Sequence, residues 1–236
     1  MSLDLYKKKR IFSQTPEPVG KKQVTKDALR FVVQKHAASR LHYDFRLEME
    51  GVLKSWAVPK GPSANPEDKR LAMMVEDHPF DYRSFEGIIP EGNYGAGTVM
   101  VWDEGTYDPL ELEGESKQKQ EKHLLKQLKN GDVKIVLHGK KLNGAYALVK
   151  MKNNSDNSWL LIKKVDKYAS KKDITKKDRS IFSERTLEEI TNDQNSDVYG
   201  SRKKNIQGNK KNEEPQLLKT STRSKTTAPV KKKFQT

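Results

Sequence analysis

The stretch His42-Tyr43-Asp44-Phe45-Arg46-Leu47-Glu48-Met49 alternates between polar and apolar residues without a break. Side chains two positions apart on a β-strand point to the same face. The apolar members therefore share one face, which we expect to lie in a core: Tyr43, Phe45, Leu47 and Met49. The other face carries His42, Asp44, Arg46 and Glu48.

Short β-type runs recur on both sides of this stretch, with turn-forming residues between them. With the opening stretch included, the expected strands are Arg30–Lys35, His42–Met49, Val52–Val58, Leu71–Val75, Gly97–Asp103, Val133–His138, Ala145–Met151 and Ser158–Lys163. One segment differs, because Ser116–Asn130 is rich in Lys, Gln, Glu and Leu and is followed by Gly131. We expect a helix there and a second, shorter one at about Glu184–Asp193.

Many short strands with one or two short helices are typical of small barrels and sandwiches. We expect a mostly β protein with a small closed barrel, because closure removes exposed strand edges. Only 33% of the residues are apolar and 33% are charged, and most aromatic residues occur no later than Tyr168. We therefore expect a β-barrel domain over residues 1–168 and a polar, lysine-rich, largely disordered tail over residues 169–236.

The net charge of +14 is concentrated in the last part of the chain, where residues 201–236 hold eleven Lys or Arg and two Glu. Such a segment would attract nucleic acid weakly and without sequence preference. A solvated extension that only aids solubility is the alternative.

The chain has no cysteine, which excludes disulfides, thiolate metal sites and a cysteine nucleophile. Neither a signal peptide nor an apolar run long enough to span a membrane is evident. We expect a soluble, cytoplasmic protein that makes no membrane contact.

The polar face of the first stretch carries groups suited to metal and phosphate. Neutral imidazole and carboxylate, as in His42 and Asp44, bind divalent metals such as Mn, Fe or Zn. Arg46 adds a planar set of donors that suits a phosphate, and a turn could fold His36 back as a third ligand. The alternative is a solvated strand face with one Asp–Arg pair and an incidental His36, which the combined spacing disfavours.

A second cluster of candidate site residues, from Glu76 to Tyr82, follows the apolar run that ends at Val75. His78 is expected where the strand gives way to a loop, and there it could donate to a phosphate oxygen or protonate a leaving group. Tyr82 could add a neutral donor. An ordinary surface turn is the alternative. The glycine-rich segment 90–97 lacks the spacing of a nucleotide-binding loop and is expected to be a plain loop.

Several motifs in order resemble the 3′-phosphoesterase domain of bacterial DNA ligase D and its free-standing archaeal and bacterial relatives, from about Tyr6 to Lys164. These are Lys9-Arg10-Ile11-Phe12 with Thr15-Pro16-Glu17-Pro18, His36 through Glu48, Ser55 through Pro62, Lys69 through Ala72, Glu76-Asp77-His78 with Tyr82, Ile89 through Gly97, and Trp102 through Gly105. On this resemblance we expect a free-standing member without a ligase or polymerase domain.

The resemblance implies a divalent metal, most often Mn²⁺ with Zn²⁺ or Co²⁺ as alternatives, on His36, His42 and Asp44. It implies that Arg46, His78 and Tyr82 surround the scissile phosphate. Further residues would support the substrate groove: Gln34, Lys60, Arg70, Glu76, Arg10 and Glu17. The implied reactions remove a 3′-terminal ribonucleoside from a primer strand and convert the resulting 3′-phosphate to 3′-OH during DNA end repair.

The implied partners are DNA or DNA/RNA 3′ ends, together with a separate DNA ligase and end-joining proteins of the nucleoid. Ile11 departs from the family pattern, which has an acidic residue after the arginine, in a segment that the family uses for the diesterase step.

Two other readings stay open. A non-catalytic module that binds DNA ends or 3′-phosphates is disfavoured because every implied metal and catalytic residue is present. An RNA-binding barrel would expose strand aromatics for base stacking, whereas Tyr43 and Phe45 are expected in the core.

Overall fold

The strand around Tyr43 belongs to a nine-stranded sheet in the computed structural model, which describes residues 3–20, 22–23, 28–152 and 157–193. The strands are β1 (Arg30–Ala37), β2 (Leu41–Met49), β3 (Val52–Val58), β4 (Lys69–Pro79), β5 (Gly87–Ile89), β6 (Gly97–Pro109), β7 (Asp132–Gly139), β8 (Asn143–Lys150) and β9 (Ser158–Lys163). The helices are α1 (Leu3–Lys8), α2 (Lys117–Asn130) and α3 (Leu187–Asn192), with 3-10 helices η1 (Phe80–Ser84) and η2 (Ile174–Lys176).

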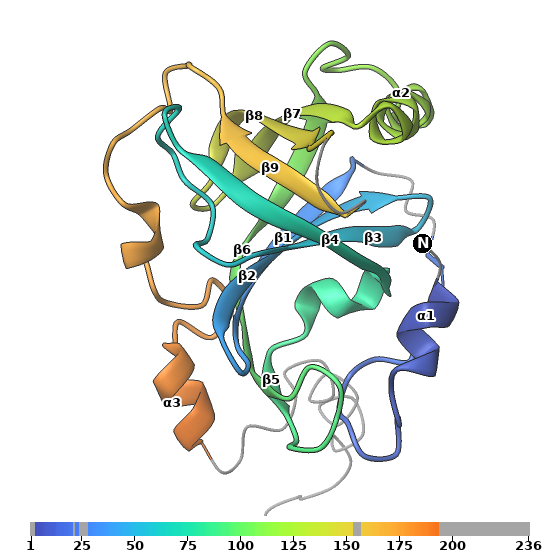
Figure 1. The fold of residues 1–236 in the computed structure, drawn as a ribbon, viewed down its shortest axis with the longest axis vertical. Coiled ribbons are helices and arrows are strands. Elements are labelled where there is room, and N and C mark those ends of the chain that lie inside the picture. Colours follow the sequence, from blue (N-terminus) through green and yellow to red (C-terminus); the bar gives the residue numbers. More distant parts are fainter. Residues whose placement is uncertain (1–2, 21, 24–27, 153–156, 194–236) are drawn as a thin grey trace, which may run out of the picture.

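Eight antiparallel strands close on themselves, which confirms the predicted barrel (Figure 1). They follow the order β1-β2-β3-β4-β9-β8-β7-β6, and the pairing of β1 with β6 completes the ring. The short strand β5 pairs with the first residues of β6 outside this ring. Among the described strands, closure leaves only the three-residue β5 at an edge of the sheet.

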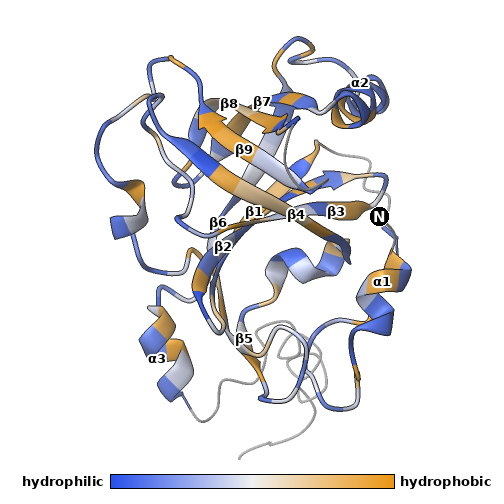
Figure 2. Cartoon of the chain, in the orientation of Figure 1, coloured by the Kyte–Doolittle hydropathy of each residue, from blue (hydrophilic) through white to orange (hydrophobic). Residues whose placement is uncertain are grey.

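The alternation in β2 places its apolar residues in the main core, as predicted. Tyr43, Phe45, Leu47 and Met49 are each buried in the cluster that also contains Trp56 and side chains from all the other barrel strands. The hydropathy colours show apolar residues concentrated on the strands and α2 as a largely hydrophilic helix (Figure 2). It buries Leu124 in the same core, and Leu125 and Leu128 pack against that core while partly buried.

The opposite face of the β1–β4 region is also covered. A second apolar cluster lies there, formed by side chains of α1, β1, β3, η1, β5 and β6, and it includes Tyr6, Phe80, Tyr82 and Phe85. α1 packs against β4 (Figure 1). The polar residues of β2 therefore lie between the barrel wall and a second layer of chain, and Asp44, Arg46 and Glu48 are buried.

Residues 169–193 pack on the barrel, contrary to the expectation of a disordered tail from residue 169. Ile190 of α3 is buried in the main core, and the Ser180 hydroxyl donates to the buried Glu86 carboxylate at 2.5 Å. Ile181 N donates to Val101 O at 3.0 Å. A few apolar anchors and buried hydrogen bonds thus hold this polar segment. The basic stretch 201–236 lies outside the described residues.

Three elements differ from the sequence-based expectation. β4 runs to Pro79, so His78 lies within a strand rather than in the loop after it, and β3 and β4 shift register between Leu53 and Ser55. α1 and β5 were not predicted, because a six-residue polar helix and a three-residue strand carry too little periodicity. In the part of the chain that the structure describes, no helix is long and apolar enough to cross a membrane.

Candidate active site

The β1–β2 hairpin brings the three candidate metal ligands together. His36 on β1 pairs directly with His42 on β2, and Gln34 pairs with Asp44. Because paired residues of antiparallel strands present their side chains on the same face, the three ligands meet beside one strand junction. Residues 38–40 form the turn between the two strands.

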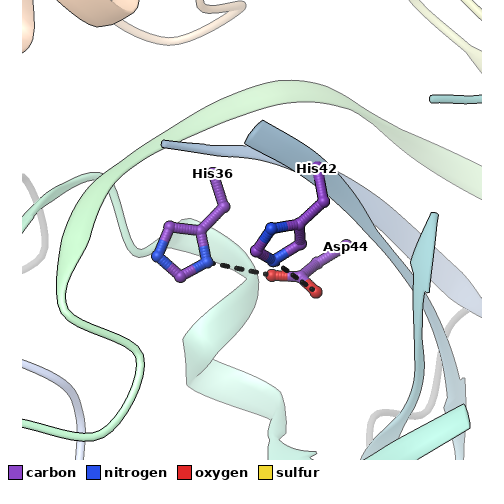
Figure 3. A group of neighbouring side chains, drawn as sticks. All are labelled: His36, His42 and Asp44. Carbon is purple, nitrogen blue, oxygen red and sulfur yellow. Dashed lines mark ion pairs between the residues drawn. The ribbon is translucent and has the colours of Figure 1, made fainter. Parts of the chain in front are cut away.

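The ligand atoms of His36, His42 and Asp44 all lie within 4.8 Å of one another. His36 Nδ1 is 3.6 Å from Asp44 Oδ2, and His42 Nε2 is 3.7 Å from Asp44 Oδ1. In Figure 3 dashed lines join both rings to the Asp44 carboxylate. The separations leave room for an ion among the three groups rather than direct hydrogen bonds.

The outer nitrogen of each ring is held by a backbone carbonyl. His36 Nε2 donates to Gly95 O at 2.9 Å, and His42 Nδ1 donates to Arg40 O at 2.9 Å. A carbonyl oxygen can only accept, so the proton of each neutral ring lies on that nitrogen. The lone pairs of the inner nitrogens then face Asp44. This second layer fixes metal-ligating tautomers, so the donor set fits a divalent metal.

Arg46 is held next to the carboxylate by three buried partners. Its Nη2 donates to Asp44 Oδ2 at 3.1 Å, its Nη1 to Ser55 Oγ at 2.9 Å, and its Nε to Gln34 Oε1 at 2.8 Å. Gln34 in turn donates to the carbonyls of Tyr82 and Phe85. The guanidinium is therefore fixed in one plane before any anion arrives.

The charge of Asp44 is maintained by its neighbours. Burial by itself would raise the pKa of this carboxyl, but the adjacent Arg46 guanidinium lowers that pKa well below its usual range. Asp44 is therefore a carboxylate at neutral pH, the state that a metal ligand requires.

His78 and Tyr82 form the neighbouring wall. Their ring centroids are 4.9 Å apart, and the Arg46 guanidinium lies 5.0 Å from the centre of the Tyr82 ring. His78 Nδ1 donates to Glu76 O at 3.0 Å, while Arg10 Nη2 lies 3.3 Å from His78 Nε2. Since a guanidinium can only donate, His78 Nε2 accepts from Arg10.

Both titratable groups of this wall are neutral in the free protein. Burial, with the cations Arg46 and Arg10, lowers the pKa of His78 well below its usual value. Burial, and then the Glu17 carboxylate, raises the pKa of Tyr82 well above its usual value. The Tyr82 hydroxyl donates to Glu17 Oε1 at 3.0 Å, so its proton is directed away from His78.

The N-terminal segment closes the site from the other side. Arg10 pairs with Glu17 at 2.8 Å and with Glu76 at 3.4 Å, and its guanidinium lies 3.8 Å from the centre of the Tyr6 ring. Lys9 pairs with Glu76 at 3.0 Å. The two cations that follow α1, Lys9 and Arg10, are thus bound to Glu76 near the end of β4.

A cavity of about 320 Å³ joins these groups. It is lined by eight of the expected site residues: Arg10, His36, His42, Asp44, Arg46, Glu76, His78 and Tyr82. Gln34 and Glu17 lie directly behind them through the hydrogen bonds to Arg46 and Tyr82.

Lys60 and Arg70 do not line this cavity. Lys60 is exposed in the turn after β3. Arg70 pairs with Asp68 at 2.9 Å at the start of β4, and eight strand residues separate it from His78, about 26 Å along the strand. Their place in a substrate groove stays a prediction about the nucleic acid beyond the cavity.

The structure adds site residues that the motif reading did not single out. Ser55 accepts from Arg46, the Gly95 carbonyl orients His36, and Tyr94 lines the cavity. The glycine-rich loop had been set aside because its spacing does not match nucleotide-binding loops. No local pattern in the sequence reveals a backbone carbonyl that orients a histidine 59 residues away.

A β-barrel with a largely buried His-His-Asp group beside Arg46, His78 and Tyr82 defines a candidate metal-dependent centre for an anionic substrate. The profile of the family described as "DNA Ligase D 3′-phosphoesterase domain" matches residues 34–150, which include the His-His-Asp group and all three wall residues. The chain belongs to this family, as the resemblance predicted.

Three similar proteins carry the name LigD. The multifunctional non-homologous end joining protein LigD of Pseudomonas aeruginosa is 48% identical over 190 residues, which are 77% of this chain and 21% of that protein. The LigD non-homologous end joining DNA repair protein of Mycobacterium tuberculosis is 46% identical over 67% of this chain and 19% of its own length. LigD of Mycolicibacterium smegmatis is 41% identical over 67% and 20%. The chain thus spans about a fifth of the length of these relatives.

Proposed function

We propose that this protein is a metal-dependent phosphoesterase that heals 3′ ends of DNA and DNA/RNA primer strands. It removes a 3′-terminal ribonucleoside and then hydrolyses the remaining 3′-phosphate to a 3′-OH. One observation carries this proposal: the inward-facing ligand atoms of His36, His42 and Asp44 share a cavity with the fixed Arg46 guanidinium. The family supports the reaction class.

The donor set favours a borderline divalent ion, and we propose Mn²⁺, with Zn²⁺ and Co²⁺ as alternatives. When bound, this metal supplies Lewis-acid polarisation of a phosphate oxygen. Asp44 contributes the negative charge, and the two imidazoles contribute neutral donors whose protons stay on the carbonyls of Gly95 and Arg40.

Arg46 is the principal phosphate-binding group. Its plane is already fixed by Asp44, Ser55 and Gln34, so no reorganisation is needed when charge develops on the non-bridging oxygens. Lysine could not reproduce this arrangement, because its ammonium is a single point charge.

His78 is proposed to protonate the leaving oxygen. It is neutral in the free protein, and an entering phosphate adds the negative charge that favours the imidazolium. In the diester step the bond from phosphorus to the 5′-oxygen of the terminal nucleoside breaks. Water supplies the oxygen added to phosphorus and, overall, the proton on the released 5′-OH. Tyr82 packs against His78 and Arg46 and orients both.

The names of the relatives place them in non-homologous end joining. We propose that this chain works on the same kind of DNA end, in the cytoplasm at the nucleoid, with a separate DNA ligase and end-joining proteins as its partners. A 3′-OH is the end that a ligase or polymerase requires.

A labelled primer with one 3′-terminal ribonucleotide tests the proposal, incubated with Mn²⁺ or with EDTA. The expected products with Mn²⁺ are first the 3′-phosphate strand and then the 3′-OH strand. His42→Ala should abolish both conversions, since it removes one ligand atom. Binding without conversion by the unaltered protein would contradict the proposal and favour a module that only recognises ends.

A further inference from the structure

Tyr94 is a half-exposed aromatic side chain on the rim of the catalytic cavity. Of the two described tyrosines that line this cavity, Tyr82 is buried and Tyr94 is 48% exposed. Tyr82 packs between His78, Phe85 and Tyr6, whereas Tyr94 belongs to neither apolar cluster. About half of the Tyr94 side chain is therefore exposed beside the phosphate-binding groups.

Lys9 and Arg10 hold Tyr94 in this position, and the Arg10 guanidinium lies 5.6 Å from the centre of its ring. Lys9 Nζ donates to the Tyr94 hydroxyl at 3.1 Å and lies 4.5 Å from the centre of its ring. The same ammonium pairs with Glu76 at 3.0 Å, so Glu76, Lys9 and Tyr94 form a chain of contacts across one side of the cavity. Asn93 Nδ2 also donates to Gln14 O at 3.4 Å. The loop and the N-terminal segment thus close this side together.

The loop is also attached to the metal-ligand group. Gly95 is the residue after Tyr94, and its carbonyl oxygen accepts a hydrogen bond from His36. Gly97 has φ +138°, and a Cβ there would lie 2.2 Å from Ala37 O, so only glycine permits this approach to the end of β1. The position of the Tyr94 ring relative to His36 is therefore set by a short, pinned stretch of backbone.

We propose that Tyr94 is the stacking platform for the base of the 3′-terminal nucleoside, the group released in the diester step. This inference rests on the proposed function and adds a binding residue to it. A continuing strand must leave the cavity through an open side, whereas the last nucleoside ends inside it. The side closed by Glu76, Lys9 and Tyr94 suits the nucleoside that ends there. Aromatic stacking accepts any base, so the platform confers recognition of an end rather than of a sequence.

Binding in EDTA tests the platform without turnover. A fluorescent primer ending in a 3′-ribonucleoside is compared with the same primer ending in an abasic ribose, by anisotropy. Loss of the base should weaken binding to the unaltered protein by about 5- to 150-fold. For Tyr94→Ala, both primers should bind with the weaker affinity.

Two control variants separate stacking from other effects. Tyr94→Phe keeps the ring and removes only the hydroxyl contact with Lys9, so it should still distinguish the two primers. Tyr168→Ala removes another exposed tyrosine, 49% exposed and outside this cavity, and should behave as the unaltered protein. Thermal melts of all variants verify folding.

A kinetic comparison in Mn²⁺ provides the second measurement. Tyr94→Ala should raise KM for release of the terminal ribonucleoside and leave KM for the 3′-phosphate strand unchanged. The inference is overturned if the unaltered protein binds both primers equally, or if Tyr94→Ala still distinguishes them. Absence of turnover with base-dependent binding intact would instead contradict the proposed function alone.

Discussion

The two faces of β2 are built from alternate residues of one strand, yet they depend on different parts of the chain. The inner face, with Tyr43, Phe45 and Leu47, packs into a core made by the barrel strands themselves. The outer face, with Asp44 and Arg46, is completed by groups from β1, β3, β4, η1 and the N-terminal segment. An apolar core needs only volume and burial, whereas a polar centre needs each donor matched to an acceptor.

Removing the ring of Phe45 should have the largest effect on folding. The side chain is fully buried in the main core, so Phe45→Ala should lower the free energy of unfolding by about 3–5 kcal/mol. Urea denaturation followed by circular dichroism measures this loss. Phe45→Leu is the matched control, and it should cost much less because most of the volume is kept.

Arg46→Lys tests the outer face of the same strand and should act mainly on catalysis. Removal of one fixed donor of this kind lowers kcat on the order of 100- to 1000-fold. The 3′-phosphate strand is the substrate, and product is read as 3′-OH. A variant that retains nearly full kcat would show that the guanidinium does not contact the phosphate.

A divalent metal should stabilise the protein only by binding to His36, His42 and Asp44. Mn²⁺ at a hundred times its Kd should raise the free energy of unfolding by about 2.7 kcal/mol, seen as a higher Tm. His42→Ala should remove this gain with little cost to the apo fold, since the His42 side chain is 22% exposed. An equal gain in both proteins would place the metal elsewhere.

The buried His78 should give the smallest effect, a dependence of stability on pH. Its pKa is lowered in the folded protein, first by burial and then by Arg46 and Arg10. The unfolded chain therefore takes up a proton more readily. Stability that is present above the ordinary pKa of about 6.5 is lost as the pH falls below it, by at most about 1.4 kcal/mol per pH unit.

His78→Asn is the comparison for this effect, because its amide can still donate to the Glu76 carbonyl. Melts in EDTA between pH 7.5 and 5 should show a steeper loss for the unaltered protein than for the variant. Parallel curves would mean that His78 titrates normally in the folded state.

Much of the fold follows from local pattern. Alternation alone identified the β2 core face, and short β-type runs located eight of the nine described strands to within a few residues. α1 and β5 were missed because they are too short to show a period. Residues 169–193 were misjudged because a single buried anchor such as Ile190 does not alter the composition of a polar segment.

The candidate site, like the fold, could be predicted from the sequence only in part. The sequence by itself determined which residue types could hold a metal and a phosphate, because His42, Asp44 and Arg46 share a face through the two-residue period of a strand. It could not place Lys60 and Arg70, since spacing along a strand does not say how far a residue lies from a site.

Only the tertiary structure decided the protonation and orientation of these groups. The carbonyl of Gly95 fixes the tautomer of His36, and burial together with the cations Arg46 and Arg10 lowers the pKa of His78 and keeps its ring neutral. Burial makes these contacts strong, because charges and hydrogen bonds are screened less where water is excluded. Partners more than fifty residues apart in the chain come into contact only when the barrel closes.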